Sequence, residues 1–420
     1  MKTIYTKTTL LLVLFLSVSC LSTLTARDKT HLITISGTVK DQKSKKKIEY
    51  ATISVPGTSI GTITNTDGEF VLKLNDTLGV PAIEISHIGY ANYQYALNGQ
   101  NVENTTFYLS ANSKELKEVV VYTADANEIV RQAIANIANN YSDKESLMTG
   151  FYRETIRKRR NYINISEAII DIYKTPYTMQ GIDHDRVQIY KGRQLMSIKP
   201  SDTLAVKFQG GPTLSNYADI VKNPDVMLDR QTLHFYKFEI DDVVMINERP
   251  HYVIKFKPQV VMPYALYVGK LYIDRQDLTV SRAEYSLSMD NKNKVTQAIL
   301  RKKPYKLQFK PEEVAFLVTY KPRGGKSYLN YIRNEVRFKC DWKKKWIFST
   351  GYTIVSEMVV TDSREDNIHK ISRKDEFRYT QTLVDKVESF YDEDFWGDFN
   401  IIEPTESLES AVNKLRKQRN

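Results

Sequence analysis

The sequence predicts a mainly β fold, in which a small β-sandwich precedes an α+β part made of a large curved antiparallel sheet with one packed helix. Three observations lead to this fold class. From residue 33 to residue 122, short runs rich in Ile, Val, Thr and Tyr alternate with turn-forming clusters at intervals of about ten residues, as in all-β sandwiches. One amphipathic helix pattern follows. From residue 150 to residue 382 the chain is again mostly strand-like, with long hairpins.

The N-terminal segment, residues 1–26, is typical of an export signal. Two lysines flank the start of the apolar run Leu10–Val18, and small or hydroxylated residues lead up to Ala26. The run is too short for a membrane span, which needs about twenty apolar residues. Cys20 follows Leu16-Ser-Val-Ser, an imperfect signal for lipid attachment. Lipidation at Cys20 and simple cleavage near Ala26 are therefore the two alternatives.

The sandwich is predicted for residues 33–122. Within it, Asn65-Thr-Asp-Gly68 is a tight turn in which Gly68 can supply a positive φ. The turn leads into a strand whose Phe70, Leu72 and Leu74 alternate with polar residues and share one face. That face is predicted to be part of the sandwich core.

Three motifs of this region carry a family resemblance: Gly37-Thr-Val-Lys-Asp41, Thr64-Asn-Thr-Asp-Gly-Glu-Phe70 and Ile88-Gly-Tyr90. Segment 33–122 resembles the carboxypeptidase-like regulatory domain, a seven-stranded sandwich of the immunoglobulin or transthyretin type. The resemblance implies a non-catalytic accessory domain and no peptidase activity. Such domains commonly stand at the N-terminus of periplasmic and outer-membrane proteins of the Bacteroidota, so the resemblance also implies that source.

A helix is predicted at the start of the second domain, residues 123–400. Asp125 is a suitable N-cap, and Glu128 stands at the capping-box position. An apolar stripe follows and ends near residues 139–140; it consists of Ile129, Val130, Ala133, Ile134, Ile137 and Ala138. One such helix beside many strands predicts a helix packed against a sheet.

Long hairpins predict the curved antiparallel sheet. Segments 269–274 and 278–287 flank a short turn, and the strand containing Cys340 is joined by a lysine turn to a second strand, 346–354. Segment 252–256 places alternate side chains on two faces. We expect one of these faces to line a groove on the concave side of the sheet, a side that something must cover.

The same strands carry a second resemblance, through Tyr252-Val-Ile-Lys-Phe256, Gly269-Lys-Leu-Tyr-Ile-Asp274 and Glu284-Tyr285. This pattern resembles the curved half-barrel of the outer-membrane lipoprotein-carrier fold. It is also similar to the periplasmic part of Bacteroidota proteins that combine the regulatory domain with a helix. The resemblance implies an open, curved sheet.

The last predicted element is a C-terminal helix within residues 401–420. Pro404 suits the first turn, Glu406 and Glu409 stand early, and basic residues stand late, as the helix dipole favours. We expect the apolar face of this helix to dock on the body of the protein. A partner-binding tail is the alternative.

The sequence contains two cysteines, Cys20 and Cys340. Because export removes or lipidates the first, no intrachain disulfide is expected. Cys340 lies on the apolar side of a clean period-two pattern. This position predicts a buried structural thiol rather than a catalytic nucleophile, which would need exposure and an activating base.

The formal net charge is +10, and the basic residues gather in runs. These are Lys45–Lys47, Arg157–Arg160, Arg301–Lys303 and Lys343–Lys345. Each run falls where strand-like segments turn, which predicts solvated hairpin tips. The alternative is contact with an anionic lipid or polysaccharide surface, which requires the loops to converge in space. A nucleic-acid partner is not expected for an exported chain.

Candidate catalytic and metal motifs are few. The sequence has no His-Glu-x-x-His and no Cys-x-x-Cys, and its six histidines are scattered. Asp183-His184-Asp185 is interpreted as a polar loop rather than a metal site, because alternating residues project in different directions. Asp241-Asp242 is interpreted as solvated. Gly210-Gly-Pro212 lacks the lysine of a phosphate-binding loop and is interpreted as the entry to a helix that plugs the sheet.

No catalytic, cofactor-binding or metal-binding residue is predicted, and no titratable cluster suited to acid–base chemistry is expected. The sequence therefore favours a non-catalytic exported protein of the periplasm, with association with the outer membrane as one outcome. Its concave sheet would hold an apolar ligand, a lipid or a protein partner, and the mature chain would have no transmembrane span. An exported hydrolase is the alternative, which would require His, Asp or Ser side chains to converge in a cleft.

Overall fold

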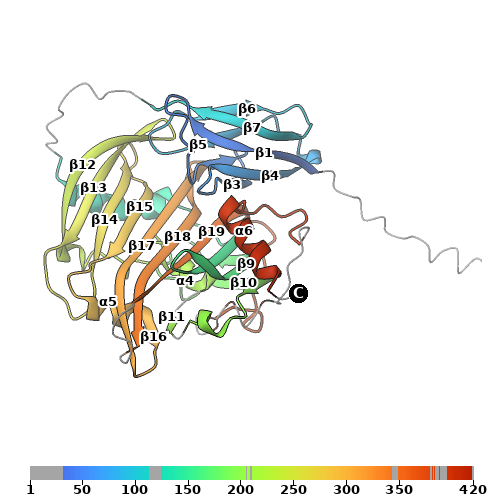
Figure 1. Cartoon of the computed structure of the whole chain (residues 1–420). Coiled ribbons are helices and arrows are strands. Elements are labelled where there is room, and N and C mark those ends of the chain that lie inside the picture. Colours follow the sequence, from blue (N-terminus) through green and yellow to red (C-terminus); the bar gives the residue numbers. More distant parts are fainter. Residues whose placement is uncertain are drawn as a thin grey trace, which may run out of the picture.

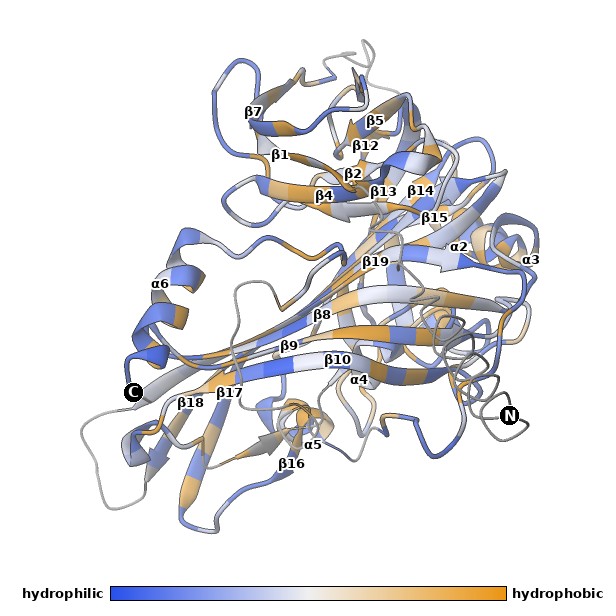
Figure 2. Ribbon diagram, turned by 90° about the vertical axis from the view of Figure 1, so that its right-hand side faces the viewer, coloured by the Kyte–Doolittle hydropathy of each residue, from blue (hydrophilic) through white to orange (hydrophobic). Residues whose placement is uncertain are grey.

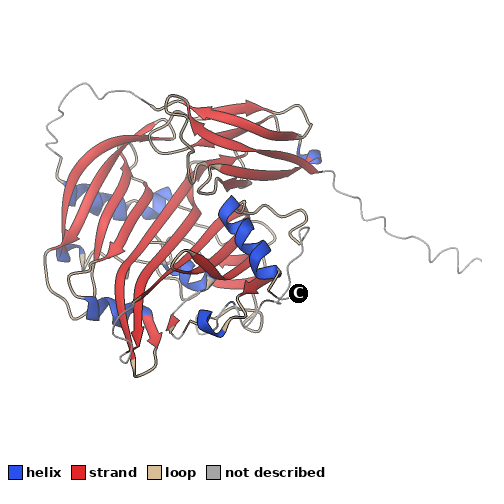
Figure 3. Ribbon diagram, viewed as in Figure 1, coloured by secondary structure: helices blue, strands red, loops and turns tan. Residues whose placement is uncertain are grey.

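Strands dominate the computed structural model of the protein (Figure 3), which describes residues 32–112, 124–204, 206–208, 211–342, 349–378 and 395–418, with the single residues 381, 383 and 387. The predicted mainly β fold class is confirmed. A small sandwich stands at one end of a long curved sheet (Figure 1).

Within residues 32–112 the N-terminal sandwich has seven strands in two sheets, as predicted. One sheet has the order β4-β1-β7 and the other β3-β2-β5-β6. The bounds are β1 Leu32–Asp41, β2 Thr52–Ser54, β3 Gly61–Ile63, β4 Glu69–Asn75, β5 Ala82–Ser86, β6 Tyr93–Ala96 and β7 Val102–Leu109, with a 3₁₀ turn at Asp76–Leu78. Gly68 precedes β4 with a φ of 70°, the positive value that the turn was predicted to need.

Phe70 lies at the centre of the sandwich core. Its ring is 1% exposed and packs against Phe107, with 5.5 Å between the ring centroids. Replacing Phe70 by alanine is expected to lower the free energy of unfolding by about 3–5 kcal/mol, because the cavity left behind cannot fully collapse. Urea denaturation measures the change, and Leu78→Ala serves as a control because Leu78 is 52% exposed. Equal effects of the two substitutions would contradict the assignment.

The second part of the chain contains one ten-stranded antiparallel sheet. Its order is β10-β9-β8-β19-β18-β17-β15-β14-β13-β12. The bounds are β8 Ser146–Lys158, β9 Asn161–Lys174, β10 Arg186–Met196, β12 Tyr236–Ile246, β13 Arg249–Pro258, β14 Tyr267–Asp274, β15 Val280–Leu287, β17 Leu307–Arg323, β18 Lys326–Trp342 and β19 Thr350–Arg364. The two predicted hairpins are confirmed as the pairs β14–β15 and β18–β19.

Helices cover parts of this sheet. They are α2 Ala126–Ala135, α3 Ile137–Asn140, α4 Pro212–Tyr217, α5 Lys292–Ile299 and α6 Glu406–Arg416; short segments are η2 Pro200–Asp202, η3 Leu233–Phe235, β11 Lys207–Phe208 and β16 Leu300–Lys302. The predicted helix is α2, which Asp125 caps by accepting a hydrogen bond from the Asn127 amide. The helix breaks at Asn136, and α3 continues to the predicted end near residues 139–140. Glu128, the expected capping-box residue, pairs with Arg131.

The sandwich contacts both the large sheet and the C-terminal segment. The Asn330 amide of β18 donates to Thr52 Oγ1 at 3.2 Å, and the Thr62 hydroxyl donates to the carbonyl of Ile401 in the C-terminal segment at 2.9 Å. Helix α6 packs its buried Leu408, Val412 and Leu415 on β9 and β10, the docking that was expected (Figure 2). The two parts therefore share apolar and polar contacts through the C-terminal segment.

In the described ranges, none of the helices has both the length and the apolar character that crossing a membrane needs.

Candidate functional site

An apolar cavity of about 210 Å³ lies between the large sheet and the segments that cover it. The aromatic rings of Tyr267, Tyr285 and Phe316 form its sheet side, and Tyr285 stacks on Phe316 with 4.9 Å between centroids. Helices α4 and α5 supply cover residues. The rest of the wall comprises Phe208, Gly211, Tyr217, Ala218, Val226, Tyr264, Ala265, Leu287, Ala298, Ile299, Val314, Val336 and Ile354. Such concave, mostly apolar sites are the usual form of small-molecule pockets.

Four polar residues, Glu154, Ser215, Asn334 and Ser356, also line the cavity. The amide nitrogen of Asn334 donates to Ser215 Oγ at 3.1 Å and to Ser356 Oγ at 3.2 Å. The other amide atom, Asn334 Oδ1, is buried and has no hydrogen-bond partner among the described residues. A buried acceptor without a partner costs about 1–3 kcal/mol, which a ligand N–H or O–H would recover.

Glu154 sets the charge of this polar end. Its carboxylate accepts a hydrogen bond of 3.0 Å from the Tyr152 hydroxyl. Burial raises the pKa of Glu154, and the bond from Tyr152 offsets only part of that rise. Burial at this end therefore disfavours negative charge, that of Glu154 included, and the site suits a neutral polar group.

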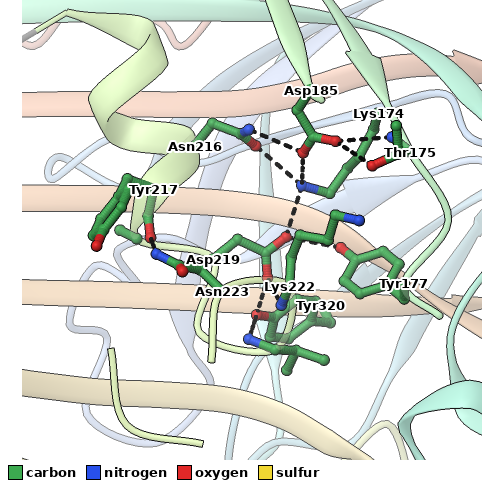
Figure 4. A network of polar contacts seen from close by, with 12 residues as sticks. Lys174, Thr175, Tyr177, Asp185, Asn216, Tyr217, Asp219, Lys222, Asn223 and Tyr320 are labelled. Carbon is green, nitrogen blue, oxygen red and sulfur yellow. Dashed lines mark hydrogen bonds and ion pairs between the residues drawn. The ribbon is translucent and has the colours of Figure 1, made fainter. Parts of the chain in front are cut away.

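A buried polar cluster lies beside the cavity, around the ammonium of Lys174 at the end of β9 (Figure 4). Lys174 Nζ lies 2.9 Å from Asp219 Oδ2 and 3.3 Å from Asp185 Oδ2, and it donates to Asn216 Oδ1 at 3.0 Å. Burial alone would lower the pKa of Lys174, but the carboxylates of Asp219 and Asp185 raise it above the usual value. The ammonium is thus held charged inside the protein.

Two tyrosines and a second lysine complete the cluster. The hydroxyls of Tyr177 and Tyr320 donate to Asp219 at 2.9 Å and 2.6 Å. Lys222 Nζ donates to the carbonyls of Pro176 and Met179, and burial lowers its pKa to about 8. The two lysines balance the two aspartates in formal charge.

This cluster positions the cavity wall. Asn216, Asp219 and Lys222 belong to α4 and the turn after it, whereas Lys174 and Tyr320 belong to the sheet. The cluster therefore holds the α4 segment on the sheet. Ser215 and Tyr217 of the same segment line the cavity. Its polar groups are saturated by one another, which gives it a structural role.

A second buried charge cluster holds the C-terminal segment. Glu167 of β9 accepts hydrogen bonds of 2.7 Å from Arg153 and from Arg193, one to each carboxylate oxygen. Arg153 also donates to the Ile402 carbonyl at 2.8 Å, and the Arg193 guanidinium lies 4.6 Å from the ring centre of Trp396. This cluster links the three strands at the β10 edge of the sheet to residues that contact the sandwich.

The residues singled out in the sequence are placed as follows. Asp185 is turned inward to the Lys174 cluster, while Asp183 and His184 are exposed. Asp241 is solvated, as interpreted, and pairs with Lys255 and Lys270. Among the described residues, no group of three or more His, Cys, Asp or Glu side chains is arranged to hold a metal.

The predictions for the two cysteines and for the glycine pair fare differently. Cys20 lies outside the described residues, so its lipidation stays a prediction. Cys340 is half-buried rather than fully inside, and burial raises its pKa to about 11, which leaves the thiol protonated and unreactive. Gly211, with a φ of 87°, leads into α4 at Pro212, so the predicted helix entry is confirmed.

One expectation about the site was wrong, and one cluster was not foreseen. Lys174, Asp185 and Asp219 meet where three separate segments converge; this structural cluster does not contradict the expectation that no titratable cluster is suited to acid–base chemistry, but the sequence did not predict it. The only signal was the placement of Lys174 after an apolar strand. Segment 252–256 was expected to line the groove, but Ile254 and Phe256 are buried in the main core, and the cavity lies nearer β17, β18 and β19.

One motif was overlooked in the sequence. Gly57-Thr-Ser59-Ile-Gly61 fits the Gly-x-Ser-x-Gly pattern of hydrolases, which requires a strand-to-helix turn that exposes the serine. Here Ser59 lies in the turn between strands β2 and β3. Its buried hydroxyl is 2.5 Å from Asp362 Oδ1 and 2.9 Å from the Ser363 carbonyl. It therefore fixes the sandwich to β19 and is not presented to a substrate.

Comparison with known proteins identifies the sandwich. Residues 35–121 match the CarboxypepD_reg-like domain. The predicted resemblance to the carboxypeptidase-like regulatory domain is thereby confirmed for this part of the chain. The Bacteroidota source stays a prediction. No curated protein matches the sequence.

Solved structures with similar folds cover the larger part of the chain. A putative outer membrane lipoprotein-sorting protein domain from Vibrio parahaemolyticus is 12% identical, with 60% of this chain and 97% of that chain covered and a TM-score of 0.28. A LolA superfamily protein from Nitrosomonas europaea is 11% identical, with coverages of 61% and 100% and a TM-score of 0.21. A DUF1329 family protein from Desulfovibrio piger is 10% identical, with coverages of 58% and 95% and a TM-score of 0.25. Scores this low carry no weight for function.

Proposed function

We propose that this protein is a non-catalytic, exported binding protein that holds an apolar ligand in the cavity beneath α4 and α5. The observation that carries the proposal is the combination of an aromatic-walled cavity with Asn334 Oδ1, a buried acceptor that has no partner among the described residues. Apolar walls supply affinity, and a few placed polar groups orient the ligand. Location in the periplasm, with or without attachment to the outer membrane, belongs to the same proposal.

The chemistry of the cavity defines the ligand class. Its walls accept a hydrocarbon or aromatic body, and the polar end accepts a hydrogen bond from a neutral N–H or O–H group. The burial that raises the pKa of Glu154 also disfavours a carboxylate head group, because a negative charge is costly in a poorly solvated space. An amide, alcohol or amine-bearing amphiphile therefore fits better than a fatty-acid anion.

The proposal is tested by placing a charge in the cavity. Ile354→Asp is expected to weaken binding of the fluorescent apolar amine N-phenyl-1-naphthylamine at least about tenfold, since an unpaired carboxylate is costly in an apolar space. The matched control is Thr353→Asp, the neighbouring position on the same strand. Thr353 does not line the cavity and stands opposite Arg337 and Arg157 in the sheet register, where a carboxylate is favourable. Fluorescence titration measures both.

A second variant distinguishes loss of binding from loss of folding. Ile354→Trp fills the cavity without adding charge and is expected to exclude the probe while the thermal melt stays cooperative. The proposal is overturned if the unmodified chain binds no apolar probe, or if both Ile354 variants are folded and bind as well as Thr353→Asp. Turnover of an ester or peptide that is lost on changing a single His, Asp or Ser would instead establish the hydrolase.

A further inference from the structure

Two of the predicted basic runs converge at the end of the sheet that lies away from the sandwich. Arg157–Arg160 span the end of β8 and the turn to β9, and Arg301–Lys303 lie at β16 just before β17. Strand pairing and ring contacts connect the two runs. Lys158 pairs with Tyr352 in the sheet register. The rings of Tyr352 and Phe208 both pack on Phe338. Strand β11, which contains Phe208, pairs with β16. Lys45–Lys47 lie on the sandwich, and Lys343–Lys345 fall outside the described residues.

Exposed apolar side chains occupy the same end. The largest exposed fractions among large hydrophobic side chains are those of Val261 (90%) and Tyr305 (88%). Val261 lies in the loop between β13 and β14, and Tyr305 follows the basic run before β17. The other members are Met196, Ile198 and Tyr264. These side chains come from separate segments of the chain, and Ile198 and Tyr305 each have a basic residue next to them in the chain.

We call this surface the distal rim and define it by its exposed residues. They are Met196, Ile198, Val261, Tyr264 and Tyr305, with the basic residues Arg159, Arg160, Lys199, Arg301, Lys302, Lys303 and Lys306. Segments 157–160, 196–204, 259–266 and 288–306 contain eleven Lys and Arg residues against two acids, Asp202 and Asp290. Asp202 is already paired with Lys158. The field of the rim is therefore strongly positive.

We propose that the distal rim docks on a membrane surface of anionic lipid headgroups. Basic residues are attracted to such a surface, while aromatic and aliphatic side chains insert at the interface between headgroups and acyl chains. A soluble polyanion would satisfy the charges but would leave Val261 and Tyr305 in water. The interleaving of exposed apolar and basic residues thus favours a lipid surface over a polysaccharide or nucleic acid.

The rim adjoins the candidate cavity. Tyr264 belongs to both, and Ile299 of the cavity wall stands two residues before Arg301 of the rim. Lys294 of α5 donates to the Met262 carbonyl, which joins the loop of Val261 to the helix that covers the cavity. If the proposed function holds, docking places the cavity next to the lipid phase that supplies or receives its ligand. Docking itself depends on the rim alone.

The test compares equal charge changes at opposite ends of the molecule. The exported chain carrying Cys20→Ser, which removes any acyl anchor, is sedimented with phosphatidylglycerol-containing vesicles. Replacing Arg301, Lys302 and Lys303 by glutamate is expected to lower partitioning at least about tenfold. The same change at Lys45, Lys46 and Lys47, which are also exposed, is expected to leave it unchanged. Val261→Ser with Tyr305→Ser is expected to weaken binding without altering its dependence on salt.

The outcomes separate the two proposals. The docking proposal is overturned if the triple substitution at residues 45–47 lowers vesicle binding as much as the one at residues 301–303. It is also overturned if heparin displaces the protein fully from vesicles and the Val261 and Tyr305 substitutions leave vesicle binding unchanged. If the protein does not bind vesicles but still binds the amine probe in an Ile354-dependent way, only the docking proposal is contradicted. If vesicle binding shows the expected pattern and no apolar probe binds, the proposed function alone fails.

Discussion

Replacing Lys174 by methionine is expected to lower the free energy of unfolding by about 3–5 kcal/mol, because removal of one partner strands buried opposite charges. Asp185 and Asp219 would keep their carboxylates next to an apolar side chain, and among the described residues Lys222 would be the nearest remaining cation. Methionine keeps the length of the lysine stem, so the loss reports the charge rather than the volume. Urea denaturation at neutral pH measures it.

The control for this prediction is Lys237→Met. Lys237 forms an ion pair with Glu239 on the surface, where both side chains are more than half exposed, and exposed pairs contribute little. The Lys174 variant is also expected to weaken amine-probe binding, since the cluster holds the α4 segment that carries Ser215 and Tyr217. If the two lysine variants were equally stable, the cluster would not fasten α4.

Local features of the fold could be predicted from the sequence. The turn at Gly68 and the hairpin β14–β15 are each determined by residues that are close in the chain, through turn chemistry and period-two alternation. The entry to α4 was predicted for the same reason. In contrast, β8 pairs with β19, bringing Phe151 beside Val359. No local pattern encodes which distant strands become neighbours.

The site was less predictable than the fold for the same physical reason. Lys174, Asp219 and Tyr320 come from three segments, and each alone resembles a solvated or strand-end residue until the chain brings them together. The sequence did indicate that the concave face must be covered. It did not indicate which strands would leave space beneath the cover, because this depends on how α4 and α5 pack over β17–β19 rather than on alternation within a strand.

Replacing Glu167 by glutamine is expected to destabilise the protein by about 3–5 kcal/mol at neutral pH, since Arg153 and Arg193 would lose the buried anion between them. Glutamine preserves the shape and one acceptor oxygen, which makes the loss a measure of charge. The contact of Arg153 with the Ile402 carbonyl links this cluster to the C-terminal segment. Trp396 lies against Arg193 and is one of three tryptophans in the chain, so fluorescence during urea denaturation is followed in a background carrying Trp342→Phe and Trp346→Phe, where it reports this region.

The effect of Glu167→Gln should depend on pH. Burial alone would raise the pKa of Glu167, but the guanidinium groups of Arg153 and Arg193 hold it below its ordinary value of 4.5. A carboxyl group with a depressed pKa in the folded state contributes stability that is complete above its unfolded pKa and is lost as the pH falls through the folded one. The difference in the free energy of unfolding between the unmodified chain and the variant should therefore have its full size at pH 7 and decrease only below pH 4.5. Glu239→Gln, which removes a carboxylate from an exposed pair, should show a small gap at every pH. A large Glu167 gap that persists unchanged into acid would mean that hydrogen-bond geometry, and not the buried charge, holds the C-terminal segment in place.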